Sequence, residues 1–415
     1  MRTGTRPIAI SGLGLITPAG IGVPATWQRV CQGRSTAAFD PQLDGLAAPF
    51  SCRVPEAQGS RSSRGSRGTD SWRLDRLTHL ALAAAREAVE DAGLDSTQWA
   101  SERVAVVLGS AAGGITTLER QHRRLLEQGP HALSPLTLPA FLPNMAAGQL
   151  AIDLHATGPV LHLSTACASG ATAIALAAGL LESDSCDIAV AGGADAMVTR
   201  LCSAAFARMG ALSTHLAAPA AASRPFDTDR DGFVLAEGAG ILILERQADA
   251  FARGHRPHAL LAGFATTTDA HHATAPDPSG LAAERALRHA LRRAGATPRD
   301  VDHVNAHGTG TRLNDSAEAA LLTRSLRGNH PPVTAAKGVL GHTMGAAGAI
   351  EAALTALTIE HRLVPPTANL EHPSPEALQL DLVTHRARRH PVNFAISNSF
   401  GFGGHNAVLA LRSAS

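Results

Sequence analysis

Aromatic side chains are scarce in this 415-residue sequence: tyrosine is absent, and Phe and Trp together make up 3% of the chain. A buried core must therefore consist mainly of aliphatic side chains. Long apolar runs are also lacking, since no stretch reaches the roughly 18 residues that a membrane-spanning helix needs. Residues 1–10 lack the apolar segment of a secretory signal peptide. We therefore predict a globular protein of the cytoplasm that does not associate with a membrane.

Cysteine pairs and a strong net charge are missing as well. The five cysteines are an odd number without a Cys-x-x-Cys spacing, which indicates neither a disulfide framework nor a zinc site. A formal net charge of +1 gives no broad electrostatic field that would attract nucleic acid. The composition therefore predicts a chain with no bound metal and no nucleic-acid partner.

What the sequence does contain is a regular alternation of apolar strands and helices. In the first half, strands are predicted at 7–14, 104–108, 160–163, 187–193 and 238–245, with helices at 23–33, 77–92 and 168–181. In the second half, strands are predicted at 259–265, 301–306, 333–336, 394–397 and 407–411, with helices at 281–294, 317–326 and 344–361. This alternation predicts an α/β fold with largely parallel sheets, repeated in two halves.

The segment 160–174 delivers Cys167 to the start of an Ala-rich helix that is apolar on all sides. Amides at a helix N-terminus and the helix dipole favour a thiolate, so we expect the pKa of Cys167 to lie below its usual value of about 8.5. Two interpretations stay open on this segment alone. Cys167 is either a nucleophile or a small buried apolar residue, since free cysteine is often buried.

Two histidines follow predicted strands and stand beside glycines. His307 lies in Asn-Ala-His-Gly-Thr-Gly-Thr at 305–311, and His342 lies in Lys-Gly-Val-Leu-Gly-His-Thr-Met-Gly at 337–345. Strand ends in α/β sheets are common positions for catalytic groups. Both histidines are therefore candidate catalytic residues.

Five motifs in order resemble those of the β-ketoacyl-[acyl-carrier-protein] synthases, most of all the synthase II type and the related ketosynthases of polyketide pathways. They are the cysteine segment 164–170, Arg-Pro-Phe-Asp-Thr-Asp-Arg-Asp-Gly at 224–232, the two histidine segments, and Asn-Ser-Phe-Gly-Phe-Gly-Gly at 398–404. The resemblance covers nearly the whole chain. It implies a thiolase-like fold of two duplicated halves in five α/β/α/β/α layers, with the cysteine in residues 1–250 and the histidines in residues 258–415.

The resemblance also implies an acyltransferase that catalyses a decarboxylative Claisen condensation of an acyl thioester with malonyl-[acyl-carrier-protein] to give 3-oxoacyl-[acyl-carrier-protein]. Cys167 would accept the acyl group, because a thiolate attacks thioesters readily. His307 and His342 would promote loss of carbon dioxide and stabilise the enolate, for which neutral imidazole donors suffice. Lys337 would orient these groups and tune the local charge, with Glu318 supporting the lysine.

Further site residues follow from the same resemblance. The backbone amides of Cys167 and Phe402 would form an oxyanion hole, and Phe400 and Phe402 would gate the pocket, although core packing is an equal alternative for Phe400. Ala112 and Phe206 would line the acyl pocket. Because synthase II relatives often carry isoleucine at the position of Ala112, the alanine predicts a deeper pocket for longer, stiffer or partly unsaturated chains.

The partners that the resemblance implies are an acyl carrier protein and a second subunit. The dimer would be a homodimer or a heterodimer with a chain-length-factor-like subunit. No cofactor is implied, since phosphopantetheine arrives on the carrier protein. Arg386, Arg388 and Arg389 are candidates for contact with an acidic carrier protein, and the three arginines of the glycine-rich segment 58–68 are candidates for contact with an acidic partner. A solvated run of charges is the alternative for both sets.

Three other functions are disfavoured. A thiolase needs a second cysteine near its C-terminus, but the last cysteine of this chain is Cys202. Initiating synthases combine the cysteine with one histidine and one asparagine, whereas this chain offers two histidines and a lysine. A non-catalytic partner subunit would lack the nucleophile that Cys167 supplies. Fatty-acid elongation and a type II polyketide or polyene pathway both stay open, as do the chain length and the starter unit.

Overall fold

A computed structural model describes residues 7–56 and 73–414 of the chain, and the arginines of the segment 58–68 lie outside the described residues. A twelve-stranded sheet runs through these residues in the order β13-β11-β10-β15-β16-β9-β1-β8-β7-β5-β6, with β2 paired to β1. Its strands are β1 Ile8–Thr17, β2 Gly20–Ile21, β5 Val104–Gly109, β6 Val160–Leu163, β7 Ile188–Ala196, β8 Glu237–Arg246, β9 Ala259–Thr268, β10 His303–Asn305, β11 Pro332–Thr334, β13 Asp381–Leu382, β15 Phe394–Gly401 and β16 His405–Arg412. Two small sheets pair β3 Ala38–Phe39 with β4 Phe50–Ser51, and β12 Leu363–Val364 with β14 Arg388–Arg389.

The strand order repeats in the two halves of the chain. Strands β1, β8, β7, β5 and β6 of the first half correspond to β9, β16, β15, β10 and β11 of the second half. In each half the first three strands pair antiparallel and the last three pair parallel. Strands β1 and β9 pair with each other and join the halves. The predicted duplication is therefore confirmed.

The prediction of largely parallel sheets was wrong, because the sheet is mixed. Strands β15 and β16 are separated only by residues 402–404, and they pair antiparallel along their whole length. A parallel pair needs a long crossover connection, usually a helix, and this short turn provides none. The predicted strands 394–397 and 407–411 have no helix between them, and this gap was the sign of an antiparallel pair.

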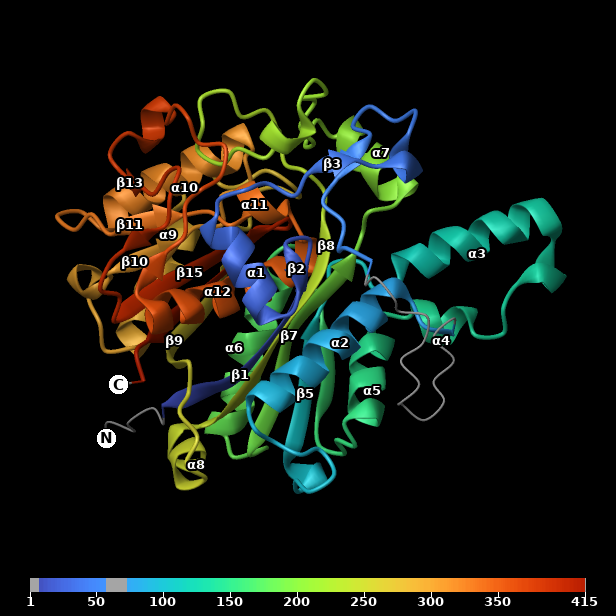
Figure 1. Cartoon of the computed structure of the whole chain (residues 1–415), viewed down its shortest axis with the longest axis horizontal. Coiled ribbons are helices and arrows are strands. Elements are labelled where there is room, and N and C mark those ends of the chain that lie inside the picture. The colour runs from blue at the N-terminus through green and yellow to red at the C-terminus, as the bar shows by residue number, and fades with distance from the viewer. Residues whose placement is uncertain (1–6, 57–72, 415) are drawn as a thin grey trace.

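Helices separate and cover the two halves of the sheet in five layers (Figure 1). Helices α2 and α5 pack on the outer face of the first half, α6 and α12 lie together in the central layer, and α9 and α10 cover the second half. The helices are α1 Val23–Cys31, α2 Arg76–Asp91, α3 Ile115–Gln128, α4 Thr137–Phe141, α5 Asn144–Asp153, α6 Ser169–Glu182, α7 Arg200–Arg208, α8 Gln247–Ala252, α9 Leu281–Arg293, α10 Arg312–Ser325, α11 Lys337–Leu340 and α12 Ala347–His361. Within 7–56 and 73–414, none of them is both long and apolar enough to cross a membrane.

The central helices approach each other closely because glycines meet at their N-terminal ends. A Cβ atom on Gly170 of α6 would lie 2.8 Å from the backbone nitrogen of Ala349, and a Cβ atom on Gly348 of α12 would lie 2.8 Å from the Cβ of Ala171. Side chains do not tolerate such distances, so only glycine fits at either position. Because Cys167 lies two residues before α6 and His342 lies five residues before α12, this contact brings the two residues together.

Candidate active site

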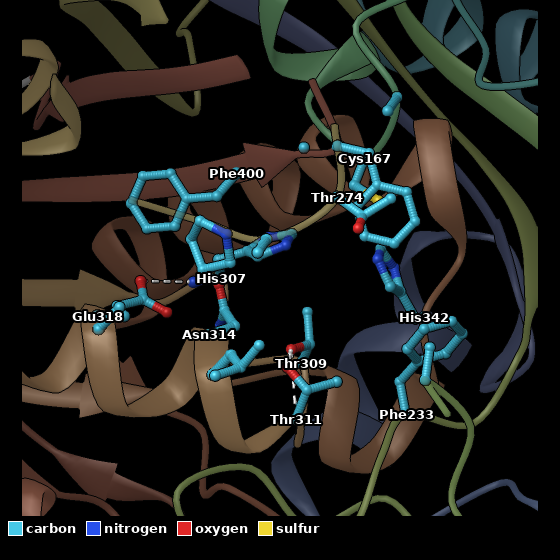
Figure 2. Close-up of a pocket in the computed structure, with 18 of the residues that line it drawn as sticks. Cys167, Phe233, Thr274, His307, Thr309, Thr311, Asn314, Glu318, His342 and Phe400 are labelled. Atoms are coloured by element: carbon cyan, nitrogen blue, oxygen red, sulfur yellow. Dashed lines mark hydrogen bonds between the residues drawn. The ribbon is translucent and has the colours of Figure 1, made fainter. Parts of the chain in front are cut away.

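A cavity of about 490 Å³ gathers the predicted catalytic residues from both halves of the chain. Cys167, His307, His342, Phe400 and Phe402 all line it. Figure 2 shows Cys167 and His342 on one side of the cavity and His307 with Phe400 on the other. The structure therefore brings together the cysteine and both histidines, although they are separated by up to 175 positions in the sequence.

Strained turns present two of these residues to the cavity. Ala166 directly before Cys167 has a φ of +50°, and Met344 shortly after His342 has a φ of +51°. Residues other than glycine avoid this left-handed region, at a cost of about 1–3 kcal/mol each, unless surrounding contacts hold them there. The hydroxyl of Ser169 donates a hydrogen bond of 2.6 Å to the carbonyl of Ala166 and accepts one of 2.9 Å from the backbone N–H of Thr165. The turn at the cysteine is thus held from inside the first turn of α6.

The thiol of Cys167 is buried beneath two backbone donors. The N–H groups of Cys167 and Phe402 each favour the thiolate and so lower the pKa of the thiol slightly. That they form an oxyanion hole stays a prediction. The predicted lowering of the pKa was wrong, because burial raises the pKa of Cys167 to about 12 and outweighs the opposing effects of Lys337 and the two N–H groups. The resting thiol is therefore protonated at neutral pH.

Gly401 allows the Phe402 amide to reach the cysteine. A Cβ atom at Gly401 would lie 2.5 Å from the carbonyl oxygen of Thr165 and 3.2 Å from the backbone nitrogen of Cys167. Any side chain there would push β15 away from the cysteine turn, so the close contact of these two segments requires glycine.

Each histidine is oriented through its Nδ1 atom. The ammonium of Lys337, which can only donate, lies 3.3 Å from Nδ1 of His307, and the backbone N–H of Met344 donates to Nδ1 of His342 at 3.2 Å. A neutral imidazole whose Nδ1 accepts carries its proton on Nε2. Burial, aided by the charge of Lys337, lowers the pKa of both histidines well below the usual range. With ring centroids 5.6 Å apart, they form a pair of neutral N–H donors.

The lysine has a different acidic partner from the one predicted. Nζ of Lys337 donates to Oε1 of Glu351 at 2.5 Å and to the carbonyl oxygen of His307 at 2.7 Å. Glu318 instead accepts hydrogen bonds from the backbone N–H groups of His307 and Gly308, at 2.9 and 2.8 Å. Glu318 therefore supports the histidine segment, not the lysine. Sequence analysis missed Glu351, although an acidic residue within the apolar first turns of helix α12 is a signal of an internal ion pair.

The wall beside Cys167 is apolar. Phe206 lines the cavity with Met197 and Phe233, and its ring lies 5.4 Å from that of Phe233 and 6.5 Å from that of Phe402. Ala111 lines the cavity, whereas its neighbour Ala112, which was predicted to line the acyl pocket, is not among the lining residues. Both alanines pack against the apolar cluster that contains Cys167, Met197 and Phe233. Phe400 both lines the cavity beside His307 and packs against the core of the second half.

The cavity opens to solvent between the end of α7, the loop after β9 and the start of α10. Met209, Thr274, Arg312 and Leu313 line it and are exposed. Among the described residues that line the cavity, Arg312 is the one lysine or arginine. Arg386, Arg388 and Arg389 do not line it, and Arg388 is paired with Asp381. A role for these three arginines in contact with a carrier protein stays a prediction.

The motif at 224–232 builds structure around the site. The carboxylate of Asp227 accepts hydrogen bonds from the backbone N–H groups of Glu371 and His372, and Arg230 lies 3.7 Å from Asp315. Neither Asp227 nor Arg230 lines the cavity. Across 7–56 and 73–414, no three or more His, Cys, Asp and Glu side chains are grouped so that they could hold a metal ion.

A buried cysteine beneath two amides, facing two neutral imidazoles in a duplicated α/β fold, defines a thiolase-like condensing enzyme. Comparison with known families narrows this class: residues 5–250 match the β-ketoacyl synthase N-terminal domain, and residues 258–371 match its C-terminal domain. The chain belongs to the β-ketoacyl synthase family.

Relatives over the full length agree with this assignment. The chain is 41% identical to 3-oxoacyl-[acyl-carrier-protein] synthase 2 of Synechocystis sp., over 98% of this chain and 97% of that protein. It is 40% identical to the synthase of the same name from Rhizobium meliloti, over 98% of this chain and 99% of that protein. The solved structure of the ishigamide ketosynthase/chain length factor superimposes with a TM-score of 0.91 at 34% identity, covering 99% of both chains. A type II polyketide ketosynthase in complex with its acyl-carrier protein gives the same TM-score at 30% identity and the same coverage.

Proposed function

We propose that this ketosynthase condenses an acyl group with a malonyl unit carried by an acyl carrier protein, releasing carbon dioxide and a 3-oxoacyl thioester. One observation supports this most strongly: the thiol of Cys167 and the imidazoles of His307 and His342 share one cavity. The nucleophile and both N–H donors for the two half-reactions are therefore present in a single chain. This also argues against a role as a non-catalytic partner subunit.

In the first half-reaction, the sulfur of Cys167 attacks the carbonyl carbon of the acyl thioester. The carbonyl oxygen gains negative charge, which the N–H groups of Cys167 and Phe402 stabilise. The bond to the pantetheine sulfur then breaks. Because burial keeps the resting thiol protonated, its proton leaves as the new bond forms, and the departing sulfur takes it up. The acyl chain is left beside the apolar wall that contains Phe206.

In the second half-reaction, malonyl thioester replaces the free carrier arm. The bond to the carboxylate breaks, carbon dioxide leaves, and the electron pair is delocalised onto the thioester oxygen as an enolate. The Nε2–H groups of His307 and His342 donate hydrogen bonds to this oxygen. The enolate carbon attacks the acyl carbonyl, the Cys167 sulfur departs, and its raised pKa favours its return to the neutral thiol by uptake of a proton from water.

The open end of the cavity fits the arm of a carrier protein. The arm is a phosphopantetheine, whose phosphate is anionic, and Arg312 places a cation where the cavity meets solvent. The hydroxyl groups of Thr309 and Thr311 line the route inward. Asp231, Asp269 and Asp277 line the cavity as well, so Arg312 is the group there that would attract the phosphate. A polar entrance followed by an apolar end matches an arm that delivers a hydrophobic chain.

A second subunit is proposed to cover strand β6. This strand ends the sheet, and its residues Val160 and Leu161 are 39% and 38% exposed. Leu176 of α6 and Ile152 of α5 are exposed as well, and α3 projects away from the body of the molecule (Figure 1). An apolar edge strand of this kind pairs readily with another chain. Sedimentation of the purified chain alone distinguishes a homodimer from a chain that needs a different subunit.

The location proposed for the enzyme is the cytoplasm. All five cysteines are free thiols, and four of them are buried where oxidation to a disulfide would disrupt the core. A reducing compartment suits such a protein.

Intact-protein mass spectrometry tests the reaction. The protein is incubated with acyl carrier proteins that bear saturated or polyenoyl chains, and malonyl-[acyl-carrier-protein] is then added. We expect one acyl group on Cys167, its loss on addition of malonyl substrate, and a 3-oxoacyl product of matching length. Cys167→Ala serves as the control. Labelling by medium and long saturated chains assigns fatty-acid elongation, and labelling mainly by unsaturated chains, or only with a partner subunit added, assigns a polyketide pathway. No labelling of wild-type protein with or without a partner subunit would refute the proposal.

A further inference from the structure

A buried carboxylate outside the catalytic set joins two segments that line the cavity. Asp195 lies near the end of β7 and is fully buried. Its Oδ2 atom accepts hydrogen bonds from the backbone N–H of Ala111 at 2.7 Å and from the backbone N–H of Gly345 at 2.6 Å. Ala111 belongs to the acyl wall, and Gly345 belongs to the turn that follows His342.

Burying the Asp195 carboxylate lowers the stability of the fold. Burial raises the pKa of Asp195 to about 7, even though the N–H groups of Ala111, Gly345 and Ala112 act in the opposite direction. No cation pairs with it among the described residues, and its Oδ1 atom has no hydrogen-bond partner there. An uncompensated buried polar group lowers stability, and an apolar residue of similar size would avoid that cost. The two hydrogen bonds of Oδ2 are what this side chain gains in return.

The hydrogen bond to Gly345 acts on the segment that orients His342. Met344, with its left-handed φ of +51°, sits between two contacts: its own N–H donates to Nδ1 of His342, and the next N–H donates to Asp195. Gly345 packs so closely that a Cβ atom there would lie 2.5 Å from Oδ2 of Asp195 and 2.5 Å from the backbone nitrogen of Ala111. The strained turn is therefore held in place from outside by Asp195.

We propose that Asp195 is a positioning residue that ties the acyl-pocket wall at Ala111 to the turn carrying His342, so that the imidazole faces the acyl group on Cys167. Asp195 touches neither substrate, and it acts through the Met344 turn. This inference rests on the proposed function, because it assigns Asp195 an effect on the step that uses His342.

The test compares Asp195→Ala with Asp195→Asn in two assays. The first measures acylation of Cys167 by an acyl carrier protein that bears a short acyl chain. The second measures release of carbon dioxide from malonyl-[acyl-carrier-protein] by enzyme that is already acylated. Alanine removes both hydrogen bonds to the turn. We expect kcat for carbon dioxide release to fall about 10- to 100-fold, as for a misplaced oxyanion donor, while acylation changes less than threefold. Asparagine keeps one acceptor oxygen and places its amide nitrogen where Oδ1 has no partner, so it should restore kcat to within about threefold of wild type.

Asp227→Ala is the matched control, since Asp227 is also fully buried and also accepts backbone hydrogen bonds, away from the cavity. It should lower the thermal midpoint without changing the ratio of the two rates. All variants are assayed below their thermal midpoints, measured by circular dichroism. Equal losses in both assays for Asp195→Ala, or no rescue by asparagine, would overturn the inference. Absence of both activities in wild-type protein would instead refute the proposed function.

Discussion

The ammonium of Lys337 lies 3.3 Å from Nδ1 of His307 and 2.5 Å from Oε1 of Glu351, with all three groups buried. Its third hydrogen bond, to the carbonyl oxygen of His307, uses its last N–H donor. One cation therefore fixes the tautomer of His307 and keeps that imidazole neutral. The arrangement explains why a lysine that is too enclosed to reach solvent is needed beside two histidines.

This relationship predicts different outcomes for stability and catalysis. Lys337→Met leaves the Glu351 carboxylate buried without its partner, and we expect a loss of about 3–5 kcal/mol in the free energy of unfolding. Adding Glu351→Leu removes the orphaned carboxylate and should recover most of that loss. The condensation rate should stay low in both variants, because Nδ1 of His307 has lost its donor. Denaturant unfolding and rate measurements check this, and a double variant with wild-type activity would contradict it.

The buried thiol predicts an unusual pH profile. With a pKa of about 12, Cys167 has little thiolate at neutral pH. Its alkylation by iodoacetamide, followed by peptide mass spectrometry, should accelerate about tenfold per pH unit between pH 7 and 10. A plateau of the alkylation rate near pH 8 would show that the helix N-terminus affects the pKa of Cys167 more strongly than burial does. Cys167→Ser confirms that the labelled peptide is the correct one.

The sequence allowed much of the fold to be predicted, because strands and helices that bury their apolar residues carry a clear pattern. Helices α3, α5 and α7 were missed, whether they leave apolar residues exposed, as α3 does with Leu118 and Leu126, or bury them, as α5 does with Leu150. Cys167, His307 and His342 were found through motifs. The pKa of Cys167 was not predicted correctly, since it depends on how deeply the thiol is buried, and that burial comes from the packing of segments distant in the sequence. For the same reason the sequence showed neither that Glu351 would meet Lys337 nor that Asp195 would join two loops.

A histidine outside the site should control acid stability. His303 on β10 is buried, and neither ring nitrogen has a partner among the described residues. Burial lowers its pKa to about 3, so below pH 6.5 the unfolded chain binds a proton that the folded chain does not. Stability is therefore lost as pH falls from about 6.5 toward 3, by about 2 kcal/mol at pH 5 from this residue alone. His303→Leu should reduce that loss, as measured by urea unfolding at pH 5 and pH 7. An unchanged difference between the two pH values would contradict the assignment.

The acyl wall should respond to side-chain volume at Ala112. Ala112→Ile adds bulk against the apolar cluster that Ala111 also contacts and should push the wall inward. We expect the rate of Cys167 acylation to fall at least about tenfold for the longest accepted chains and to change little for short ones. Ala112→Gly, which removes side-chain volume, should leave the rate of Cys167 acylation by long chains unchanged. The idea of a deep pocket fails if the isoleucine variant shows the wild-type profile of chain lengths.

The most direct test of the central claim separates the two half-reactions. Enzyme acylated on Cys167 is mixed with malonyl-carrier protein labelled in its free carboxyl group, and release of labelled carbon dioxide is timed for wild type, His307→Ala and His342→Ala. If the two neutral N–H donors stabilise the enolate, each variant should accept the acyl group yet release carbon dioxide about 100-fold or more slowly. Release at the wild-type rate from either acylated variant would show that its histidine is not such a donor.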